Sequence, residues 1–223
     1  MYNMVFCVVN DGTVEERERL PDCDVAVFGF GGLGEVDYES ELKGDTDRFD
    51  KVARLSKEGD CGLICGCKTI SRGLLRKSAA VSDRGKLLGI SDMLHVLDCE
   101  EFKSGSSLGF YRVGGCKVGL CIENDLLFPD TFKSFSMCGC NAVVAVLEEL
   151  RNNVPPLLIR AYSYLYGIPI VMTAGKTAYF ADISGAIATS TQNITLFEVS
   201  PRNNYHLVTT RIKGIAADTK PDY

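Results

Sequence analysis

The sequence predicts an α/β protein with sheets of mixed strand direction and helices packed outside them. Three observations lead to this fold class. Apolar, β-rich runs alternate with segments of helical periodicity, which favours helices on the outer faces of sheets. Two pairs of runs are joined by short turns rich in Ser and Gly, which requires antiparallel neighbours as well. No long linker or low-complexity segment divides the chain, so residues 1–223 are interpreted as one domain.

The first half of the chain is predicted to contain short buried strands and one helix. The strands are expected over residues 4–9, 24–28, 62–65, 78–81 and 86–90, the last two joined by a hairpin turn. The charged residues 13–19 are interpreted as a connector or a short helix. The helix is expected over Asp45–Glu58, with Asp45 or Thr46 as its cap and Gly59 after its end. Its apolar face is predicted to hold Phe49, Val52, Ala53 and Ser56.

The second half is predicted to complete the sheets and to add two helices. Strands are expected over residues 117–122, 141–147, 168–173, 178–183, 186–190, 196–199 and 206–212. A short helix is expected over Asp130–Cys138, directly after Pro129. A second helix is expected to begin at Pro155 and to end before Gly167. Its predicted apolar face holds Leu158, Ala161, Tyr162 and Leu165.

Composition and charge narrow the classes of function. Apolar residues make up 46% of the chain, yet no run approaches the roughly 18 apolar residues of a membrane helix. The N-terminus lacks the pattern of a signal peptide, so a cytoplasmic protein is expected. The net charge is −5, without a basic block, which argues against nucleic acid and anionic membranes as partners.

The ten cysteines are interpreted as reduced thiols that behave as small hydrophobic residues. Most of them lie in apolar runs. Cys61, Cys65 and Cys67 lie close together, as do Cys138 and Cys140, but no Cys-x-x-Cys pair occurs and both histidines are isolated. Neither a metal site nor a cofactor is therefore predicted.

The most informative segment is Lys117–Asp130, which predicts a buried strand, a sharp elbow and the start of a helix. Elbows of this kind present a nucleophile at the end of a strand. The segment resembles the nucleophile motif of the nitrilase (carbon-nitrogen hydrolase) superfamily, Gly-x-x-Ile-Cys-x-Asp-x-x-Phe-Pro-Glu. The positions in register are Gly119, Asp125, Phe128, Pro129 and Asp130. The resemblance implies an α-β-β-α sandwich of two mixed sheets flanked by helices.

Further matches to the superfamily occur in the right order along most of the chain. They are residues 24–28, residues 85–90 followed by Met93–His95, Glu101–Phe102 with Gly105, residues 139–144, and Arg160–Ala161. The resemblance also implies a homodimer, because relatives use their C-terminal segments at dimer interfaces. The tail over residues 216–223 is expected to be solvated.

The residues that should carry the superfamily's chemistry are replaced. Its members cleave C–N bonds with a cysteine nucleophile, a glutamate that moves protons and a lysine that stabilises the tetrahedral intermediate. The equivalent positions hold Glu123, Phe30 and Met93. The Glu-Asn that follows Arg-Ala in the family is Ser163-Tyr164 in this chain. No residue is therefore assigned as catalytic.

Three functions are consistent with these replacements. The leading hypothesis is a non-catalytic homologue that binds a small ligand or a protein partner. The alternative is a divergent amidohydrolase that cleaves a small amide or nitrile, using a carboxylate or Cys121. Cys121 lies two residues before the elbow, where it is expected to point to the same side of the strand as Glu123 but deeper. The third possibility is a structural subunit paired with an active homologue.

A binding site is predicted at the elbow. Glu123 and Asp125, with Asp130 nearby, would form a small acidic pocket for a cation, an amine or a guanidinium group. The predicted ligand-binding residues are Glu123, Asn124, Asp125 and Arg160. No counter-charge for Glu123 is evident, so burial would favour its protonated form. In the alternative interpretation, Glu123 bonds backbone amides or Arg160 in a filled pocket.

Residues 29–34 match the dinucleotide fingerprint Gly-x-Gly-x-x-Gly after a predicted strand. The fingerprint requires a helix to begin within the glycine loop. Residues 35–42, which follow, show little helical periodicity, and the next helix is expected near Asp47. The segment is therefore interpreted as a flexible loop rather than a nucleotide site.

Overall fold

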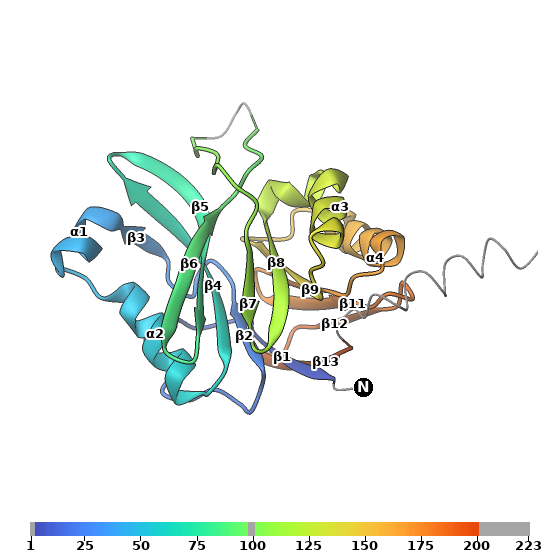
Figure 1. Ribbon diagram of the computed structural model, residues 1–223, viewed down its shortest axis with the longest axis horizontal. Coiled ribbons are helices and arrows are strands. Elements are labelled where there is room, and N and C mark those ends of the chain that lie inside the picture. Colours follow the sequence, from blue (N-terminus) through green and yellow to red (C-terminus); the bar gives the residue numbers. More distant parts are fainter. Residues whose placement is uncertain (1–2, 98–100, 201–223) are drawn as a thin grey trace, which may run out of the picture.

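Two mixed β-sheets lie face to face at the centre of the protein, with helices on their outer sides (Figure 1). The computed structural model describes residues 3–97 and 101–200. This arrangement confirms the predicted fold class. The expected strand over residues 206–212 and the tail over residues 216–223 lie outside the described residues.

The first sheet has seven strands in the order β13-β1-β2-β4-β5-β6, with β3 paired to β4 off this path. Its strands are β1 (Met4–Val9), β2 (Val25–Phe28), β3 (Glu35–Asp37), β4 (Gly62–Ser71), β5 (Leu74–Asp83), β6 (Lys86–Asp92) and β13 (Ile194–Val199). Strands β1, β2 and β4 run parallel, and β4, β5 and β6 are joined as antiparallel neighbours. At the predicted hairpin turn between β5 and β6, Arg84 and Gly85 both have positive φ, as a two-residue turn requires.

The second sheet has six strands in the order β12-β11-β10-β9-β8-β7. Its strands are β7 (Phe110–Val113), β8 (Cys116–Ile122), β9 (Ala142–Leu147), β10 (Ile170–Ala174), β11 (Thr177–Ala181) and β12 (Ile187–Ser190). Strands β8, β9 and β10 run parallel, so their carboxyl ends meet at one edge of the sheet. The elbow that follows β8 lies at this edge.

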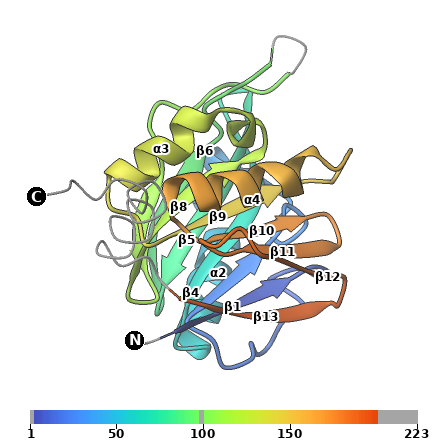
Figure 2. The same ribbon diagram turned by 90° about the vertical axis from the view of Figure 1, so that its right-hand side faces the viewer.

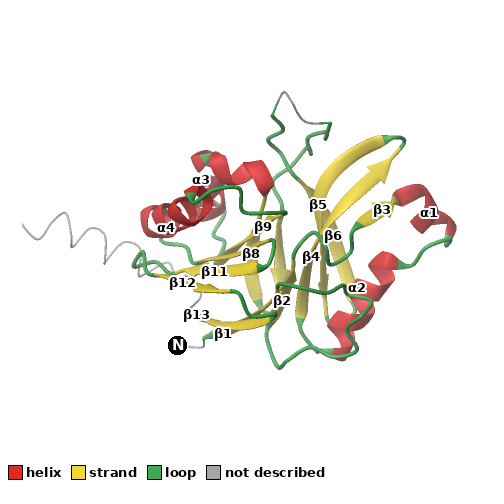
Figure 3. Cartoon of the chain, turned by 180° about the vertical axis from the view of Figure 1, so that it is seen from behind, coloured by secondary structure: helices red, strands yellow, loops and turns green. Residues whose placement is uncertain are grey.

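The helices divide between the two outer faces. They are α1 (Tyr38–Lys43), α2 (Arg48–Glu58), the 3₁₀ helix η1 (Glu123–Leu127), α3 (Pro129–Met137) and α4 (Val154–Tyr166). Helix α2 covers the first sheet, and α3 and α4 lie across the second sheet (Figures 2 and 3). The protein therefore has four layers: helix, sheet, sheet and helix.

Period-two alternation in the strands separates the core into layers. In β1, Phe6 and Val8 contribute to the cluster between the sheets, whereas Cys7 and Val9 pack in the cluster that contains residues of α2. The alternation continues in β8, where Leu120 and Ile122 belong to the cluster between the sheets. A side chain's position along a strand thus decides which layer it enters.

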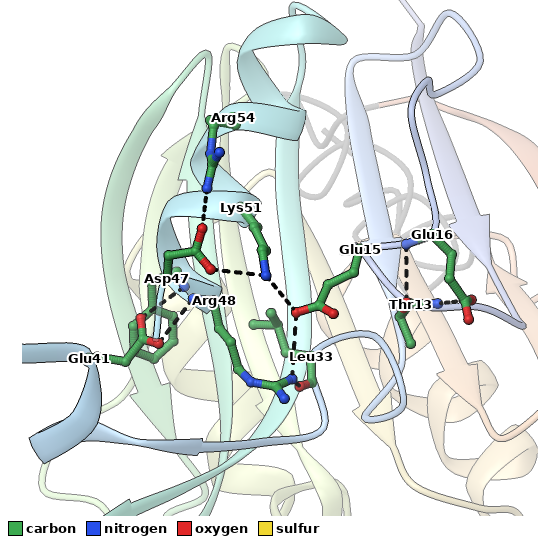
Figure 4. A network of polar contacts seen from close by, with 10 residues as sticks. Thr13, Glu15, Glu16, Leu33, Glu41, Asp47, Arg48, Lys51 and Arg54 are labelled. Atoms are coloured by element: carbon green, nitrogen blue, oxygen red, sulfur yellow. Dashed lines mark hydrogen bonds and ion pairs between the residues drawn. The ribbon is translucent and has the colours of Figure 1, made fainter. Parts of the chain in front are cut away.

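The expectation that residues 35–42 hold no helix is wrong, and so are the proposed caps of α2, whereas its expected start near Asp47 is confirmed. A short strand and then α1 follow the glycine loop. The segment lacks an apolar periodicity because α1 is exposed and has no buried residue. Helix α2 begins after Asp47 rather than at Asp45 or Thr46. Its first amides, from Arg48 and Phe49, donate to the carboxylate of Glu41 in α1, so a neighbouring helix supplies the cap (Figure 4).

The predicted apolar face of α4 is also partly wrong. Its buried residues are Ile159, Tyr162 and Ser163, whereas Leu165 is 55% exposed. Ser163 can be buried because its hydroxyl bonds the carbonyls of Arg160 and Asp182. Residues 13–19 contain no helix and form a connector.

Among the residues with a described placement, every helix is too short or too polar to span a bilayer. Within the same residues, no group of three His, Cys, Asp or Glu side chains is arranged to hold a metal ion.

Candidate functional site

The elbow lies where β8 ends at Ile122 and η1 begins at Glu123. Glu123 has φ of 48°, in the left-handed region that residues other than glycine seldom adopt. The chain therefore turns sharply at the position where the superfamily motif carries its nucleophile. The side chain presented there is a carboxylate rather than a thiol.

An ion-pair network, buried at Lys77 and partly exposed at Lys68 and Glu148, holds the Glu123 carboxylate. Lys77 Nζ lies 3.4 Å from Glu123 Oε1 and 3.2 Å from Glu148 Oε2. The backbone amide of Glu148 donates a hydrogen bond to Glu123 Oε1 at 2.5 Å. Lys68 Nζ completes the network at 2.6 Å from Glu148 Oε1. Two lysines and two glutamates thus balance each other across the two sheets.

Sequence reasoning missed Lys77, the counter-charge of Glu123. Lys77 lies in β5, which begins four residues earlier than predicted, and its side chain is only 6% exposed. Ala79 and Val81, two and four residues further on, face the core between the sheets. The period-two pattern of a longer strand would have placed Lys77 on the same face.

Phe30 and Met93, which the sequence motifs align with the other two triad positions, are buried in the core between the sheets. The Phe30 ring centroid lies 5.8 Å from Lys77 Nζ, and the backbone amide of Met93 donates to the Lys77 carbonyl at 2.8 Å. All three triad-equivalent residues therefore lie close to Lys77. Neither Phe30 nor Met93 carries a group that can move a proton.

Burial raises the pKa of a carboxyl group and a neighbouring positive charge lowers it, and the balance differs between Glu123 and Glu148. Burial raises the pKa of Glu123 above its ordinary value, and the Glu148 amide and Lys77 offset only part of this increase. Glu148 is 38% exposed, and its hydrogen bonds from Lys68 and Lys77 outweigh burial, so its pKa is lowered. Glu148 therefore carries its charge more readily than Glu123 does.

Asp125 connects the elbow to the segment that follows β6. Its buried carboxylate accepts hydrogen bonds from the amides of Leu94 and His95, and from His95 Nδ1 at 2.8 Å. The His95 ring stacks on Phe128 with centroids 3.7 Å apart. Asp125 thus acts as a structural brace beneath the elbow rather than as an open wall of a pocket.

A hollow of about 180 Å³ opens beside the elbow. Glu123, Asn124, Lys77 and Arg151 contribute to its lining. Arg160, predicted as a further site residue, lies elsewhere: its Nε donates to the Gly185 carbonyl in the hairpin between β11 and β12. The acidic residue Asp130 is exposed in the first turn of α3.

The expectation that Cys121 and Glu123 share one side of the strand is wrong. Cys121 is fully buried in the cluster under α3 and α4, whereas Glu123 reaches across to Lys77 in the first sheet. The alternation of β8 ends at Ile122, because the left-handed turn at Glu123 redirects its side chain. Burial also holds the pKa of the Cys121 thiol well above its ordinary value.

The fold has clear counterparts among solved structures. No family model matches this sequence, and no curated protein sequence matches it. A carbon-nitrogen hydrolase from Helicobacter pylori G27 matches with a TM-score of 0.72 and 16% identity, over 100% of this chain and 97% of the other. Nit3 from Saccharomyces cerevisiae, a member of branch 10 of the nitrilase superfamily, matches with a TM-score of 0.74 and 11% identity, over 99% and 97%.

A mutant amidase from Nesterenkonia sp. AN1, in which acrylamide has added to the active-site cysteine, gives a TM-score of 0.69 and 13% identity, over 96% of this chain and 99% of the other. These likenesses extend over almost the entire chain. They confirm the nitrilase-like α-β-β-α sandwich that the motifs predict. At this level of identity they show the fold alone.

Proposed function

We propose that this protein is a non-catalytic homologue of the carbon-nitrogen hydrolases and that it functions by binding. The observation that carries the proposal is the elbow itself. The nucleophile position holds Glu123, whose carboxylate is engaged by Lys77 and by the amide of Glu148. Acyl transfer requires an activated nucleophile at this position and a neighbouring base, and the superfamily uses a thiolate and a glutamate there.

Three further features support the absence of thiol chemistry. In the motif alignment, Phe30 falls at the position of the general base and Met93 at that of the lysine. Cys121 is buried on the helical side of β8, away from the elbow. Lys77 is close enough to contribute positive charge, but it is shared between Glu123 and Glu148.

The hollow beside Glu123 and Asn124 remains large enough for a few atoms of a ligand.

The test is a turnover assay with a panel of small amides, nitriles and carbamoyl compounds. The amidase from Nesterenkonia sp. AN1 serves as the positive control under the same conditions. We expect no hydrolysis above the buffer rate for the wild-type chain. Hydrolysis that disappears in the Glu123→Ala variant would overturn the proposal, because the carboxylate at the elbow would then be needed for the reaction.

Thiol labelling tests the alternative of a divergent amidohydrolase. Acrylamide adds to the active-site cysteine of the E41Q mutant of the Nesterenkonia amidase. In this protein we expect peptide mass spectrometry to find acrylamide on Cys138, which is exposed, and not on Cys121, which is buried. Preferential modification of Cys121 in the folded protein would support the alternative.

A further inference from the structure

A second hollow lies where four strand ends meet, next to the elbow network. Residues that follow β1, β2, β9 and β10 line it, and its volume is about 400 Å³. All four strands contribute their carboxyl ends, and β1 and β2 come from the other sheet than β9 and β10. Crevices outside the carboxyl ends of parallel strands are the usual ligand sites of α/β proteins. Phe30 and Glu148 line this hollow too, which connects it to the Lys77 network.

One residue that lines this hollow carries an unpaired hydrogen-bond acceptor. Asn10, which follows β1 and lines it, is only 8% exposed. Its side-chain Nδ2 donates to the Gln192 carbonyl at 2.7 Å, and its backbone amide donates to the Asn193 carbonyl at 2.8 Å. The bond from Nδ2 fixes the orientation of the carboxamide. Its Oδ1 is buried without a hydrogen-bond partner among the described residues. A buried acceptor of this kind is costly unless a bound molecule supplies a donor.

The charge around the hollow favours a cationic donor. Asp11, Glu16, Glu148 and Lys176 line it. Glu148 is already matched by Lys68 and Lys77, and Lys176 lies 3.7 Å from Asp11. Within the described part of the chain, no basic group lies at ion-pair distance from Glu16. Mutual hydrogen bonds between Glu16 and Thr13 hold this carboxylate in place (Figure 4).

The glycine loop after β2 forms a wall of the hollow without side chains. Gly29, Gly31 and Gly32 line it. A Cβ at Gly32 would lie 2.6 Å from Cys65 Sγ, so the loop packs tightly on its inner side, whereas a Cβ at Gly31 would meet nothing within 4 Å. No helix begins in this loop, because β3 follows it. A nucleotide phosphate would therefore find no helix N-terminus there, and it would meet the carboxylates of Asp11 and Glu16.

We propose that this hollow binds a small molecule with a cationic N–H donor, an ammonium or a guanidinium group. The N–H bonds Asn10 Oδ1, and the positive charge is balanced by the Glu16 carboxylate. The inference deepens the proposed binding function and rests on it, since the ligand is held without being cleaved. Binding and turnover are measured separately, so failure of the ligand site and failure of the non-catalytic proposal give different results.

The test is an NMR titration of the ¹⁵N-labelled full chain with n-butylammonium and with methylguanidinium. n-Butanol and butyrate serve as the neutral and the anionic controls. We expect saturable shifts at the amides of Gly12, Gly31 and Gly175 with the cations only. The absence of saturable shifts with either cation would overturn the proposal. Equal shifts with n-butanol or butyrate would also overturn it, because the site would then not select a cationic donor.

Three variants locate the site. Asn10→Leu removes the unpaired oxygen and should weaken cation binding by about tenfold or more. Thr131→Val is the matched control: it removes a different buried oxygen without a hydrogen-bond partner, the hydroxyl of Thr131 in α3, and should leave binding unchanged. Gly31→Leu fills the hollow from a position outside the left-handed region and should abolish binding, even where Asn10→Leu fails to fold. Wild-type affinity in Gly31→Leu would place the cation elsewhere and overturn the proposal.

Discussion

At the scale of single residues, Lys77 is the group on which the elbow depends most. It is the cation that offsets the buried Glu123 carboxylate, and removing one partner of a buried pair leaves an uncompensated charge. We expect Lys77→Met to lower the free energy of unfolding by about 3 kcal/mol. Urea denaturation at neutral pH measures this quantity directly.

The matched control is the double variant Lys77→Met/Glu123→Gln, which removes both charges. Its loss of stability should be smaller than the loss in Lys77→Met, because the buried carboxylate is no longer present. A double variant that loses as much stability as Lys77→Met, or more, would contradict the assignment of Lys77 as the counter-charge of Glu123.

The two glutamates of the network should give opposite pH dependences. The pKa of Glu123 is raised in the folded state, so its contribution to stability is present below its unfolded pKa, about 4.3, and is lost as the pH rises through its folded value. The pKa of Glu148 is lowered, so its contribution is present above about 4.3 and is lost as the pH falls.

Urea denaturation over a pH series, with Glu123→Gln and Glu148→Gln as comparison variants, tests these directions. As the pH rises from about 4, the stability of the wild type should fall relative to Glu123→Gln and should rise relative to Glu148→Gln. Two differences that change in the same direction would show that the network does not perturb the two carboxyl groups in opposite ways.

At the scale of elements, most strands could be predicted because their apolar runs are short and bounded by Gly, Pro or charged residues. Strand β8 is an example of a short buried run, and the hairpin between β5 and β6 shows two such runs joined by a recognisable turn. Helix α1 could not be predicted in this way, because it buries no side chain and therefore leaves no apolar pattern. Its contribution is to carry Glu41 to the start of α2.

The contact between β8 and α3 gives a sharp test of how the elbow is supported. A Cβ at Gly119 would lie 2.5 Å from Cδ1 of Phe135, so the strand and the helix can approach only because this position lacks a side chain. We expect Gly119→Ala to lower the free energy of unfolding by about 1–3 kcal/mol.

Gly31→Ala is the control for this substitution, since a Cβ there meets open space. It should change stability little. Combining Gly119→Ala with Phe135→Leu should recover part of the loss, because the shorter side chain relieves the contact. A Gly119→Ala variant as stable as the wild type, measured by urea denaturation, would contradict this packing.

At the scale of the whole molecule, the motifs identified the fold but could not identify the partners of the site residues. Solved structures with 11–16% identity share this sandwich over almost the entire chain. The ion pair between Lys77 and Glu123 joins residues 46 positions apart in different sheets, so no local pattern reports it. The unpaired oxygen of Asn10 likewise appears only when the strand ends are assembled.

The outer face of the second helical layer carries the last prediction, which concerns assembly. Leu157, Tyr164 and Leu165 of α4 are 55–62% exposed, and Met137 at the end of α3 is 78% exposed. Apolar side chains that gather on one face favour association, and a stable interface buries about 1,600 Å² in total.

We expect light scattering after size exclusion to give a homodimer, twice the 24.3 kDa of the chain. Leu157→Glu/Leu165→Glu should shift it to the monomer, while Leu42→Glu, on the exposed surface of α1, should not. A wild-type chain that elutes as a monomer would contradict this prediction.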